Sequence, residues 1–465
     1  MPELLTQVEP SEIAATLSPV QGAMPRALLT DLYELRMAAS YLRHGMAESA
    51  TFSLFARQLP PSRGFLVAAG LEDCLSFIED FRFEEHEINY LRDVQRMDRR
   101  AIDSFRALRF TGDVWAVPEG RIVFANEPLL EVSAPLPQAQ LLETFLLNQV
   151  TVETALASKA ARVRLAAKGT DLVDFSFRRT QGIEAAMMVA RVSAMVGFRA
   201  TSNVEAARTF GLSASGTMAH SYVQAFPTEA AAFRAFAEDY PDDTTFLVDT
   251  YDTLAGVQTA VDVIKAQHLQ GRLAIRLDSG DLRVLSRRAR RLLDDAGLFD
   301  VRIIASGGLD ELEVAALVHA GAPIDAYGVG TRMGVSADAP YLDTVYKLVV
   351  YAGRPVMKLS TGKETLPGAK QVFRQPGLRD AIGLRDEPAP AGAESLLQPV
   401  MQAGRRLDPS PSLEDARQRF ESDLDALPAH CRRLVDPEPM PVHLTQRLAH
   451  LAEQTRAAAG QRRIA

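Results

Sequence analysis

Cysteine is scarce in this sequence, with only Cys74 and Cys431 among 465 residues. Two cysteines cannot build a disulfide framework or a cysteine-rich metal site, so we expect a reducing, cytoplasmic setting. Long apolar runs are also missing. No stretch of 18 apolar residues occurs, which argues against a helix that spans a membrane. The first residues, MPELLTQVEP, lack an apolar core, and we expect no secretory signal peptide.

Positive charge is in short supply as well. Lys and Arg total 51 against 59 Asp and Glu, so the formal net charge is −8. A domain that binds nucleic acid through its phosphates usually carries a basic excess, and we therefore expect no nucleic-acid partner. Hydrophobic residues make up 47% of the chain and charged residues 24%, as in globular proteins. The length is sufficient for two or three domains.

The residue pattern divides the chain into five sections. Residues 1–25 form a proline-containing leader, and residues 26–137 are interpreted as a mixed α/β domain. Residues 138–344 are predicted to form an α/β barrel, and residues 345–395 a β-rich return to the N-terminal domain. Residues 396–465 are interpreted as a helical, charged tail.

Local signals in the outer sections give more detailed expectations. Thr30 is a plausible N-cap for the first helix. Residues 110–120 and 127–135 resemble short antiparallel strands. Residues 345–374 are strand-rich and are expected to rejoin this N-terminal β section, whereas the Pro/Gly-rich residues 375–395 are expected to form a connector.

From residue 138 the pattern changes to one long helix followed by alternating strands and helices. The strand-like segments are LVDFSF, FRATS, TTFLVDT, LAIRLDSG, VRIIASGG and PIDAYGVGT. Strands that alternate with helices imply parallel βαβ units. About five or six such units favour an α/β barrel, or a close relative, over an open dinucleotide-binding sheet.

Active sites of parallel α/β folds lie at the carboxyl ends of the strands. Arg178 and Arg179 follow the first strand and precede a helix. Two guanidiniums at this position could bind an anion, and the simpler alternative is a solvated pair of surface arginines. His220 lies in SGTMAHS, at another expected strand end. An isolated histidine is more often structural than catalytic, so its position alone does not assign it a role.

Two glycine-containing loops follow the last two strands. They are Ser306-Gly307-Gly308 and Gly330-Thr331. Glycines let backbone N–H groups approach a phosphate closely, and a barrel usually binds phosphate after these strands. Glycine is common in such turns, so the pair is more informative than either loop alone.

Carboxylates follow two further strands. Asp249 and Asp278 could hold a Mg²⁺-bound polyphosphate or bind ribose hydroxyls. Asp252 and Asp281 fit better as helix N-caps, and Asp310 has the same position before a later helix. Neither G-x-S-x-G nor G-x-x-x-x-G-K-[ST] occurs, and GVGTRMG has the wrong glycine spacing for a dinucleotide fingerprint.

A set of segments then identifies a family. TDLYELRMA, FSFRRTQG, GTMAHS, RLDSGD, ASGGLDE, YGVGT, VYKLV and TLPGAKQVFR occur in this order, and together they resemble nicotinate phosphoribosyltransferases over roughly residues 26–374. The resemblance implies a type II phosphoribosyltransferase fold, which is an irregular α/β barrel with a flanking mixed β-rich domain and a helical C-terminal tail. It also implies formation of nicotinate mononucleotide and pyrophosphate from nicotinate and phosphoribosyl pyrophosphate, the first step from nicotinate to NAD.

The resemblance further implies ATP as a co-substrate, Mg²⁺ as a cofactor and a homodimer with shared active sites. His220 would be phosphorylated by ATP, and Tyr33 of a neighbouring subunit would sandwich the pyridine ring with Phe175. Arg178 would bind pyrophosphate or phosphate, and Arg276 and Asp278 would contact the ring and the ribose and act in catalysis. Ser202, Thr217 and Ser279 would contact the substrate, and Asp249 and Asp278 would bind Mg²⁺. The residues implied to bind the 5′-phosphate are Ser306, Gly307, Gly308, Gly330 and Thr331.

Other functions remain open at this point. A nicotinamide- or quinolinate-using relative would share the fold, and nicotinamide-using relatives place an Asp where this sequence has Ser202. Ser202 could instead cap the helix that begins at Asn203. A barrel phosphosugar isomerase or aldolase would share the phosphate loops but needs a catalytic Lys or Glu at a strand end. A non-catalytic binding protein would not need intact motifs at every strand end.

Overall fold

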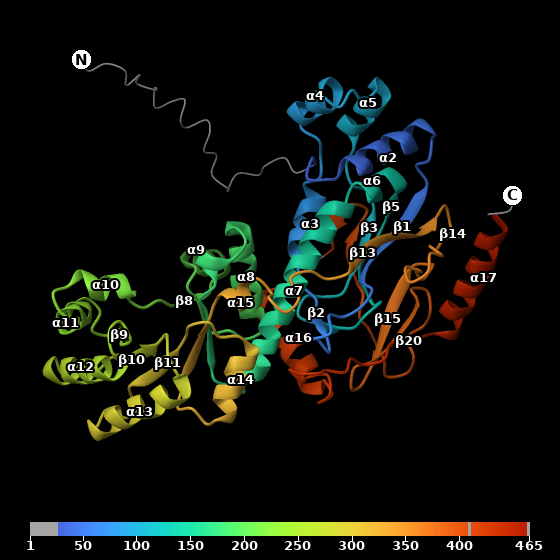
Figure 1. Cartoon of the computed structure of the whole chain (residues 1–465). Coiled ribbons are helices and arrows are strands. Elements are labelled where there is room, and N and C mark those ends of the chain that lie inside the picture. The colour runs from blue at the N-terminus through green and yellow to red at the C-terminus, as the bar shows by residue number, and fades with distance from the viewer. Residues whose placement is uncertain (1–26, 408–410, 463–465) are drawn as a thin grey trace, which may run out of the picture.

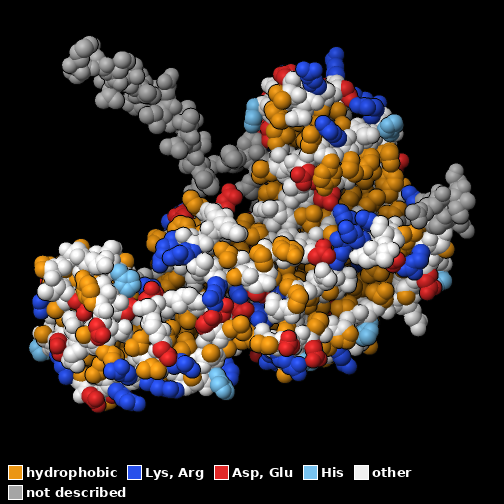
Figure 2. Space-filling model, viewed as in Figure 1, with side chains coloured by type: hydrophobic (Ala, Val, Ile, Leu, Met, Phe, Trp, Pro, Cys, Tyr) orange, Lys and Arg blue, Asp and Glu red, His pale blue; other side chains and the backbone are white. Residues whose placement is uncertain are grey.

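The computed structural model describes residues 27–407 and 411–462, so the predicted leader lies outside the described residues. Figure 1 shows two parts on either side of the long helix α7 (Glu143–Ala167): a parallel barrel-like sheet with its helices, and a β-rich part. Over the described ranges, no helix combines the length and apolarity needed to cross a membrane. Figure 2 shows cationic and anionic side chains interspersed over one face of the molecule.

The barrel part is a seven-stranded parallel sheet in the order β8-β7-β6-β12-β11-β10-β9. Its strands are β6 (Asp171–Asp174), β7 (Ala200–Thr201), β8 (Ser213–Ala214), β9 (Asp243–Leu247), β10 (Arg272–Leu277), β11 (Arg302–Ala305) and β12 (Ala326–Val329). The order is cyclic: β12 pairs with β6, as closure of a barrel requires, while β8 and β9 form the two sheet edges. The sheet is therefore a barrel opened between β8 and β9, and the predicted irregular α/β barrel is confirmed.

Helices follow the barrel strands. They are η1 (Phe177–Arg179), α8 (Ile183–Met195), α9 (Val204–Phe210), α10 (His220–Ala225), α11 (Glu229–Asp239), α12 (Thr253–Ala266), α13 (Leu282–Asp295), α14 (Glu311–His319) and α15 (Thr331–Gly334). The predicted caps Asp252, Asp281 and Asp310 are confirmed, because each side chain accepts hydrogen bonds from backbone N–H groups in the first turn of its helix.

The β-rich part contains a second seven-stranded sheet, in the order β14-β13-β1-β5-β3-β18-β19. Its strands are β1 (Ser49–Ala56), β3 (Asp113–Ala116), β5 (Pro128–Pro135), β13 (Thr344–Tyr351), β14 (Arg354–Pro355), β18 (Gln398–Gln402) and β19 (Arg405–Arg406). The predicted antiparallel pair is confirmed as β3 with β5, and β13 pairs with β1. The chain after the barrel therefore returns to the N-terminal β section, as predicted.

Smaller elements complete this part. The N-terminal helices are α2 (Leu32–Arg43), α3 (Leu71–Glu79), α4 (Glu85–Asp93), α5 (Arg99–Ala107) and α6 (Leu136–Gln140), and β2 (Leu66–Val67) pairs with β4 (Ile122–Val123). The sequence predicts Thr30 as the N-cap of α2, but this prediction is wrong, because the N-cap is Asp31. The Thr30 hydroxyl instead donates to the Glu34 carboxylate at 2.6 Å, which draws it away from the capping position.

Two expectations for the C-terminal chain are wrong. The predicted connector 375–395 contains β16 (Arg379–Leu384) and β17 (Glu394–Ser395), which form a four-stranded sheet with β15 (Lys370–Gln375) and β20 (His443–Leu444). Pro376 and Gly377 form the turn of the β15–β16 hairpin, and the remaining Pro residues lie in the loop between β16 and β17. The predicted helical tail begins with the strands β18 and β19, and is helical only in α16 (Leu413–Ala426) and α17 (Gln446–Arg462).

Candidate active site

Arg276 is the centre of a polar cluster at the carboxyl ends of the barrel strands. From β10, its guanidinium donates to Ser306 Oγ at 2.7 Å, to Thr217 Oγ1 at 3.0 Å and to Asp278 Oδ1 at 2.6 Å. Its Cζ atom lies 5.2 Å from the centroid of the Phe175 ring. One guanidinium therefore joins side chains from four strand ends, and these contacts hold its plane in a fixed orientation.

Asp278 is the carboxylate partner in this cluster. It accepts hydrogen bonds from Arg276 and from the Ser306 hydroxyl. Partial burial raises the pKa of Asp278, but the hydrogen bond from Ser306 and the charge and hydrogen bond of Arg276 lower it by more, so that the net pKa is below its ordinary value. The carboxylate is therefore ionised at neutral pH.

Asp249 supports Asp278 from the neighbouring strand. Its Oδ2 atom accepts from the Asp278 backbone N–H at 3.1 Å and from the Ser279 hydroxyl at 2.5 Å. Its Oδ1 atom is buried and has no hydrogen-bond partner among the described residues. A buried, unpartnered carboxylate oxygen is available to bind a cation or a hydroxyl group.

His220 joins the cluster from α10. Its Nδ1 atom shares a hydrogen bond with Thr250 Oγ1 at 3.1 Å, and its Nε2 atom lies 3.9 Å from Asp278 Oδ2. The expectation that His220 ends a strand is wrong, because β8 ends at Ala214 and His220 is the first residue of α10. The intervening loop nevertheless brings the imidazole, which is partly exposed, to the same edge of the sheet.

Two glycines let these strand ends approach closely. Gly307 has φ +90°, and a Cβ atom there would lie 1.8 Å from the Asp278 carbonyl oxygen. A Cβ atom on Gly328 of β12 would lie 2.4 Å from the Phe175 ring. Gly328 and Thr250 were not among the site residues predicted from the sequence. A glycine inside a strand is a recognised signal of close approach, whereas nothing near Thr250 in the sequence indicates its histidine partner.

Several of the predicted phosphate ligands present unpaired donors, whereas the Ser306 hydroxyl is bonded to Arg276 and Asp278. The backbone N–H groups of Gly307 and Gly308 donate to no other group in the described part of the chain. Arg178 and Arg179 lie on η1, are exposed, and form no ion pair with any described carboxylate. Gly330 and Thr331 begin α15 directly after β12. The described residues thus leave several donors free at one edge of the sheet.

Tyr33 is the predicted residue that this chain does not bring to the cluster. It lies on α2 in the β-rich part, with 47% of its surface exposed. Partial burial and the nearby carboxylates of Glu143, Glu34 and Asp31 raise its pKa above the ordinary value. Figure 1 shows α2 separated from the barrel strands. Within one chain, Tyr33 and Phe175 therefore belong to different surfaces.

Ser202 follows β7 and is half-buried, with no hydrogen bond to its hydroxyl among the described residues. The alternative that Ser202 caps the next helix is wrong. Asn203 is the N-cap of α9, and its side chain accepts from the Ala206 backbone N–H at 3.1 Å. The Ser202 hydroxyl is therefore left for another partner.

The parallel strands of this barrel carry unpaired cationic and backbone donors beside the ionised Asp278 carboxylate. This arrangement is typical of enzymes of the phosphate-binding α/β-barrel class. Family models described as the nicotinate phosphoribosyltransferase N-terminal domain, family and C-terminal domain match residues 28–151, 170–375 and 356–452. The chain belongs to the nicotinate phosphoribosyltransferase family.

Individual relatives agree with this assignment. A nicotinate phosphoribosyltransferase of Mycobacterium tuberculosis is 49% identical over 418 residues, which cover 88% of this chain and 89% of the relative. The Bacillus subtilis enzyme is 39% identical, covering 90% and 93%. The crystal structure of human nicotinic acid phosphoribosyltransferase superposes with a TM-score of 0.82 at 30% identity, covering 91% and 99%.

The close approach at Gly307 yields a prediction. Gly307→Ala should lower enzymatic activity at least tenfold, because the added Cβ must displace the Asp278 backbone and with it the Arg276 contacts. The matched control is Gly297→Ala, whose glycine has φ +77° and nothing within 4 Å. Both variants carry the strain of a positive φ, roughly 1–2 kcal/mol. Initial rates and thermal unfolding of both variants separate the two effects, and equal activity losses would contradict the argument.

Proposed function

We propose that this protein transfers the phosphoribosyl group of phosphoribosyl pyrophosphate to nicotinate, releasing pyrophosphate, and that ATP hydrolysis through a phosphohistidine is coupled to the reaction. The proposal rests chiefly on the position of the Arg276 guanidinium. Hydrogen bonds to Asp278 and Ser306 fix this group, and it lies beside the Phe175 ring. The direct experiment is a product assay with nicotinate, nicotinamide or quinolinate and phosphoribosyl pyrophosphate. Absence of nicotinate mononucleotide would overturn the proposal.

The chemistry requires three functions from these residues. The bond between C1 of the ribose and the pyrophosphate oxygen breaks, and a bond forms from C1 to the pyridine nitrogen. Positive charge develops at C1, and the ionised Asp278 stabilises it. The Phe175 ring aligns the pyridine for attack. Arg178 and the N–H groups of Gly307 and Gly308 bind the phosphates.

Mg²⁺ fits this site in one particular way. The described residues contain no group of three His, Cys, Asp or Glu side chains that could hold a metal alone. Mg²⁺ commonly binds through one or two carboxylates and the substrate phosphates, and the unpartnered Asp249 Oδ1 and the Asp278 carboxylate offer such ligands. A bound Mg²⁺ would neutralise charge on the departing pyrophosphate. Chelation in the product assay tests this requirement.

His220 is proposed as the residue that takes the γ-phosphoryl group of ATP. Its partners Thr250 and Asp278 fix the ring at the edge of the phosphate site. We predict that His220→Ala abolishes the stimulation by ATP and the phosphoryl mass added to the intact protein. His86→Ala, an exposed residue on α4, is the matched control and should retain both. If ATP still stimulates the His220→Ala variant, His220 is not the residue that accepts the phosphoryl group.

A homodimer is proposed because two exposed apolar surfaces lie in one chain. Around the site, at the starts of barrel helices or in the turns before them, Phe177, Ile183, Val204, Tyr251 and Val284 are exposed. In the β-rich part, Leu29, Leu32 and Tyr33 are exposed at or beside the start of α2, and Figure 2 shows hydrophobic side chains gathered over the α2–β1 region. Contact between the two surfaces of different subunits would cover both and bring Tyr33 to Phe175.

Subunit complementation tests this arrangement. We predict that chains carrying Tyr33→Ala and chains carrying Phe175→Ala are each strongly impaired, and that mixing them after dissociation restores activity. In a mixed dimer one of the two sites has both rings intact, so a minority of the wild-type activity should return. The control is each variant dissociated and reassociated alone. No gain in the mixture would indicate that the site is formed within one chain.

Ser202 is proposed to contribute to the preference for an acid over an amide. An Asp at this position would face the nicotinate carboxylate with like charge, costing roughly 4 kcal/mol at 4 Å and an effective dielectric of 20. Even a third of this cost changes kcat/KM about tenfold. We predict that Ser202→Asp erodes the preference for nicotinate mainly through loss of nicotinate turnover. Ser202→Ala, which removes only the hydroxyl, should have a smaller effect. An unchanged nicotinate-to-nicotinamide ratio in Ser202→Asp would assign the discrimination elsewhere.

A further inference from the structure

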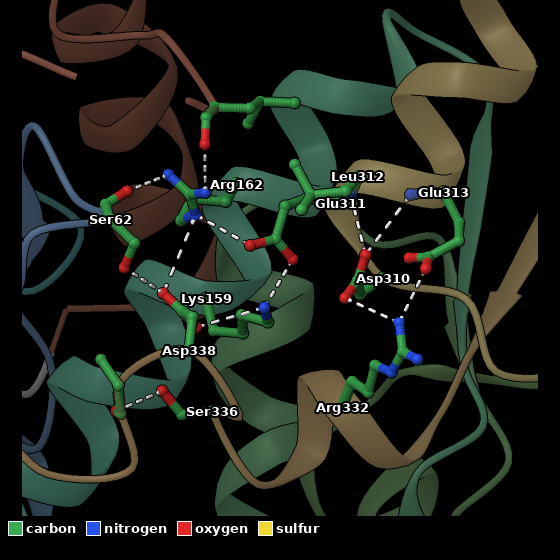
Figure 3. Close-up of polar contacts among 12 residues, drawn as sticks. Ser62, Lys159, Arg162, Asp310, Glu311, Leu312, Glu313, Arg332, Ser336 and Asp338 are labelled. Atoms are coloured by element: carbon green, nitrogen blue, oxygen red, sulfur yellow. Dashed lines mark hydrogen bonds and ion pairs between the residues drawn. The ribbon is translucent and has the colours of Figure 1, made fainter. Parts of the chain in front are cut away.

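Both candidate phosphate loops are connected to the first turn of α14, one through the backbone and the other through a side chain. The first loop, residues 306–308, runs directly into that helix through its N-cap Asp310. The second loop leads into α15, where the Arg332 guanidinium contacts Asp310 Oδ2 at 3.1 Å and Glu313 Oε1 at 2.8 Å, as Figure 3 shows. The start of α14 therefore sets the position of one loop relative to the other.

Glu311, the first residue of α14, attaches this turn to the central helix. Its carboxylate is buried and accepts hydrogen bonds from Lys159 Nζ at 2.5 Å and from Arg162 Nε at 3.0 Å. Both cations lie on α7 and are also buried. In Figure 3 they point from α7 toward the Glu311 carboxylate. Glu311 is three residues beyond Gly308, so a shift of this turn must move the loop as well.

The same cations extend the network to the β-rich part. Lys159 Nζ lies 3.1 Å from Asp338 Oδ1, and Asp338 follows α15. Asp338 also accepts from Arg63 Nε at 3.0 Å and Ser62 Oγ at 2.8 Å, both from the segment between β1 and β2. Despite burial, Arg63 and Lys159 hold the pKa of Asp338 well below its ordinary value. The network thus fixes segments on both sides of the two loops.

A gain in folding stability does not by itself explain why this network of buried ion pairs is present. Buried ion pairs are often replaceable by apolar side chains with no loss of stability, because desolvation offsets their attraction. Their directional hydrogen bonds, in contrast, define a geometry that apolar contacts do not. Within the described ranges, this network lies where the α14 turn, the α15 segment and α7 meet, next to the two loops.

We propose that Glu311 is a positioning residue, which acts through α14 to set the spacing of loops 306–308 and 330–331 for a ribose 5-phosphate group. The inference rests on the proposed function, because phosphoribosyl pyrophosphate is the ligand that carries this group. Among the described residues, the Glu311 carboxylate pairs with Lys159 and Arg162, and the helix that it anchors adjoins the phosphate loops and not the Phe175 ring. Its effect should therefore fall on one substrate and not on both.

The test is the steady-state kinetics of full-length Glu311→Gln. We expect the KM for phosphoribosyl pyrophosphate to rise at least tenfold, with the KM for nicotinate, measured at saturating phosphoribosyl pyrophosphate, changed less than twofold. Asp380→Asn is the matched control. Asp380 is equally buried and pairs with Arg374 between β15 and β16, away from both loops, so this variant should lower the unfolding temperature and leave both KM values unchanged.

A second variant covers the case in which Glu311→Gln does not fold. Arg332→Gln removes the exposed link between α15 and α14 without leaving a deeply buried charge unpaired, and it should raise the KM for phosphoribosyl pyrophosphate in the same selective way. A variant that loses thermal stability with both KM values unchanged would overturn the inference and leave Glu311 a purely structural residue. Failure of the proposed function is distinguishable, because the wild-type protein would then form no nicotinate mononucleotide.

Discussion

The structure depends on helix α7, which is buried along most of its length. It has almost no solvent-exposed face, because every residue from Glu153 to Val163 is buried. Such a helix must be covered on more than one side, and the barrel and the β-rich sheet are the two layers that cover it (Figure 1). Because a buried charge is costly without a partner, the buried Lys159 and Arg162 form ion pairs with Glu311 and Asp338, next to the loops of the site.

Parallel strand direction is the second constraint, and it explains how residues far apart in the sequence meet. Thr217, Arg276 and Ser306 follow or end three different strands, yet they form one hydrogen-bonded cluster because all parallel strands end at the same edge. This is why the residues after each strand predicted Asp278, Ser306 and His220 as site residues, whereas Arg276, Thr217 and Phe175 were implied only by the family resemblance. Strand direction does not explain the position of Tyr33, because this residue lies on α2 and not at the end of a barrel strand.

Prediction from the sequence worked where the signal was local and failed where it depended on distant partners. Alternating strand and helix patterns identified the barrel, and the aspartates before helices identified their caps. The β15–β16 hairpin was missed because its Pro-Gly turn looks like a linker until β16 has a partner strand. The Thr250–His220 hydrogen bond and the Lys159–Glu311 pair join residues 30 and 152 positions apart, and no pattern in one sequence relates them.

The arginines of the site divide into two kinds, and the division says what each can do. Arg276 makes three hydrogen bonds to protein partners and its side chain is 13% exposed, so its orientation is fixed before any ligand binds. Arg178 and Arg179 are exposed and form no ion pair with a described carboxylate, so an arriving phosphate meets guanidiniums that need not give up a protein partner. The proposed function uses both kinds, because it requires one group that is fixed beside the pyridine ring and others that can bind a polyphosphate. The proposed function therefore divides these tasks between the buried guanidinium of β10 and the exposed guanidiniums of η1.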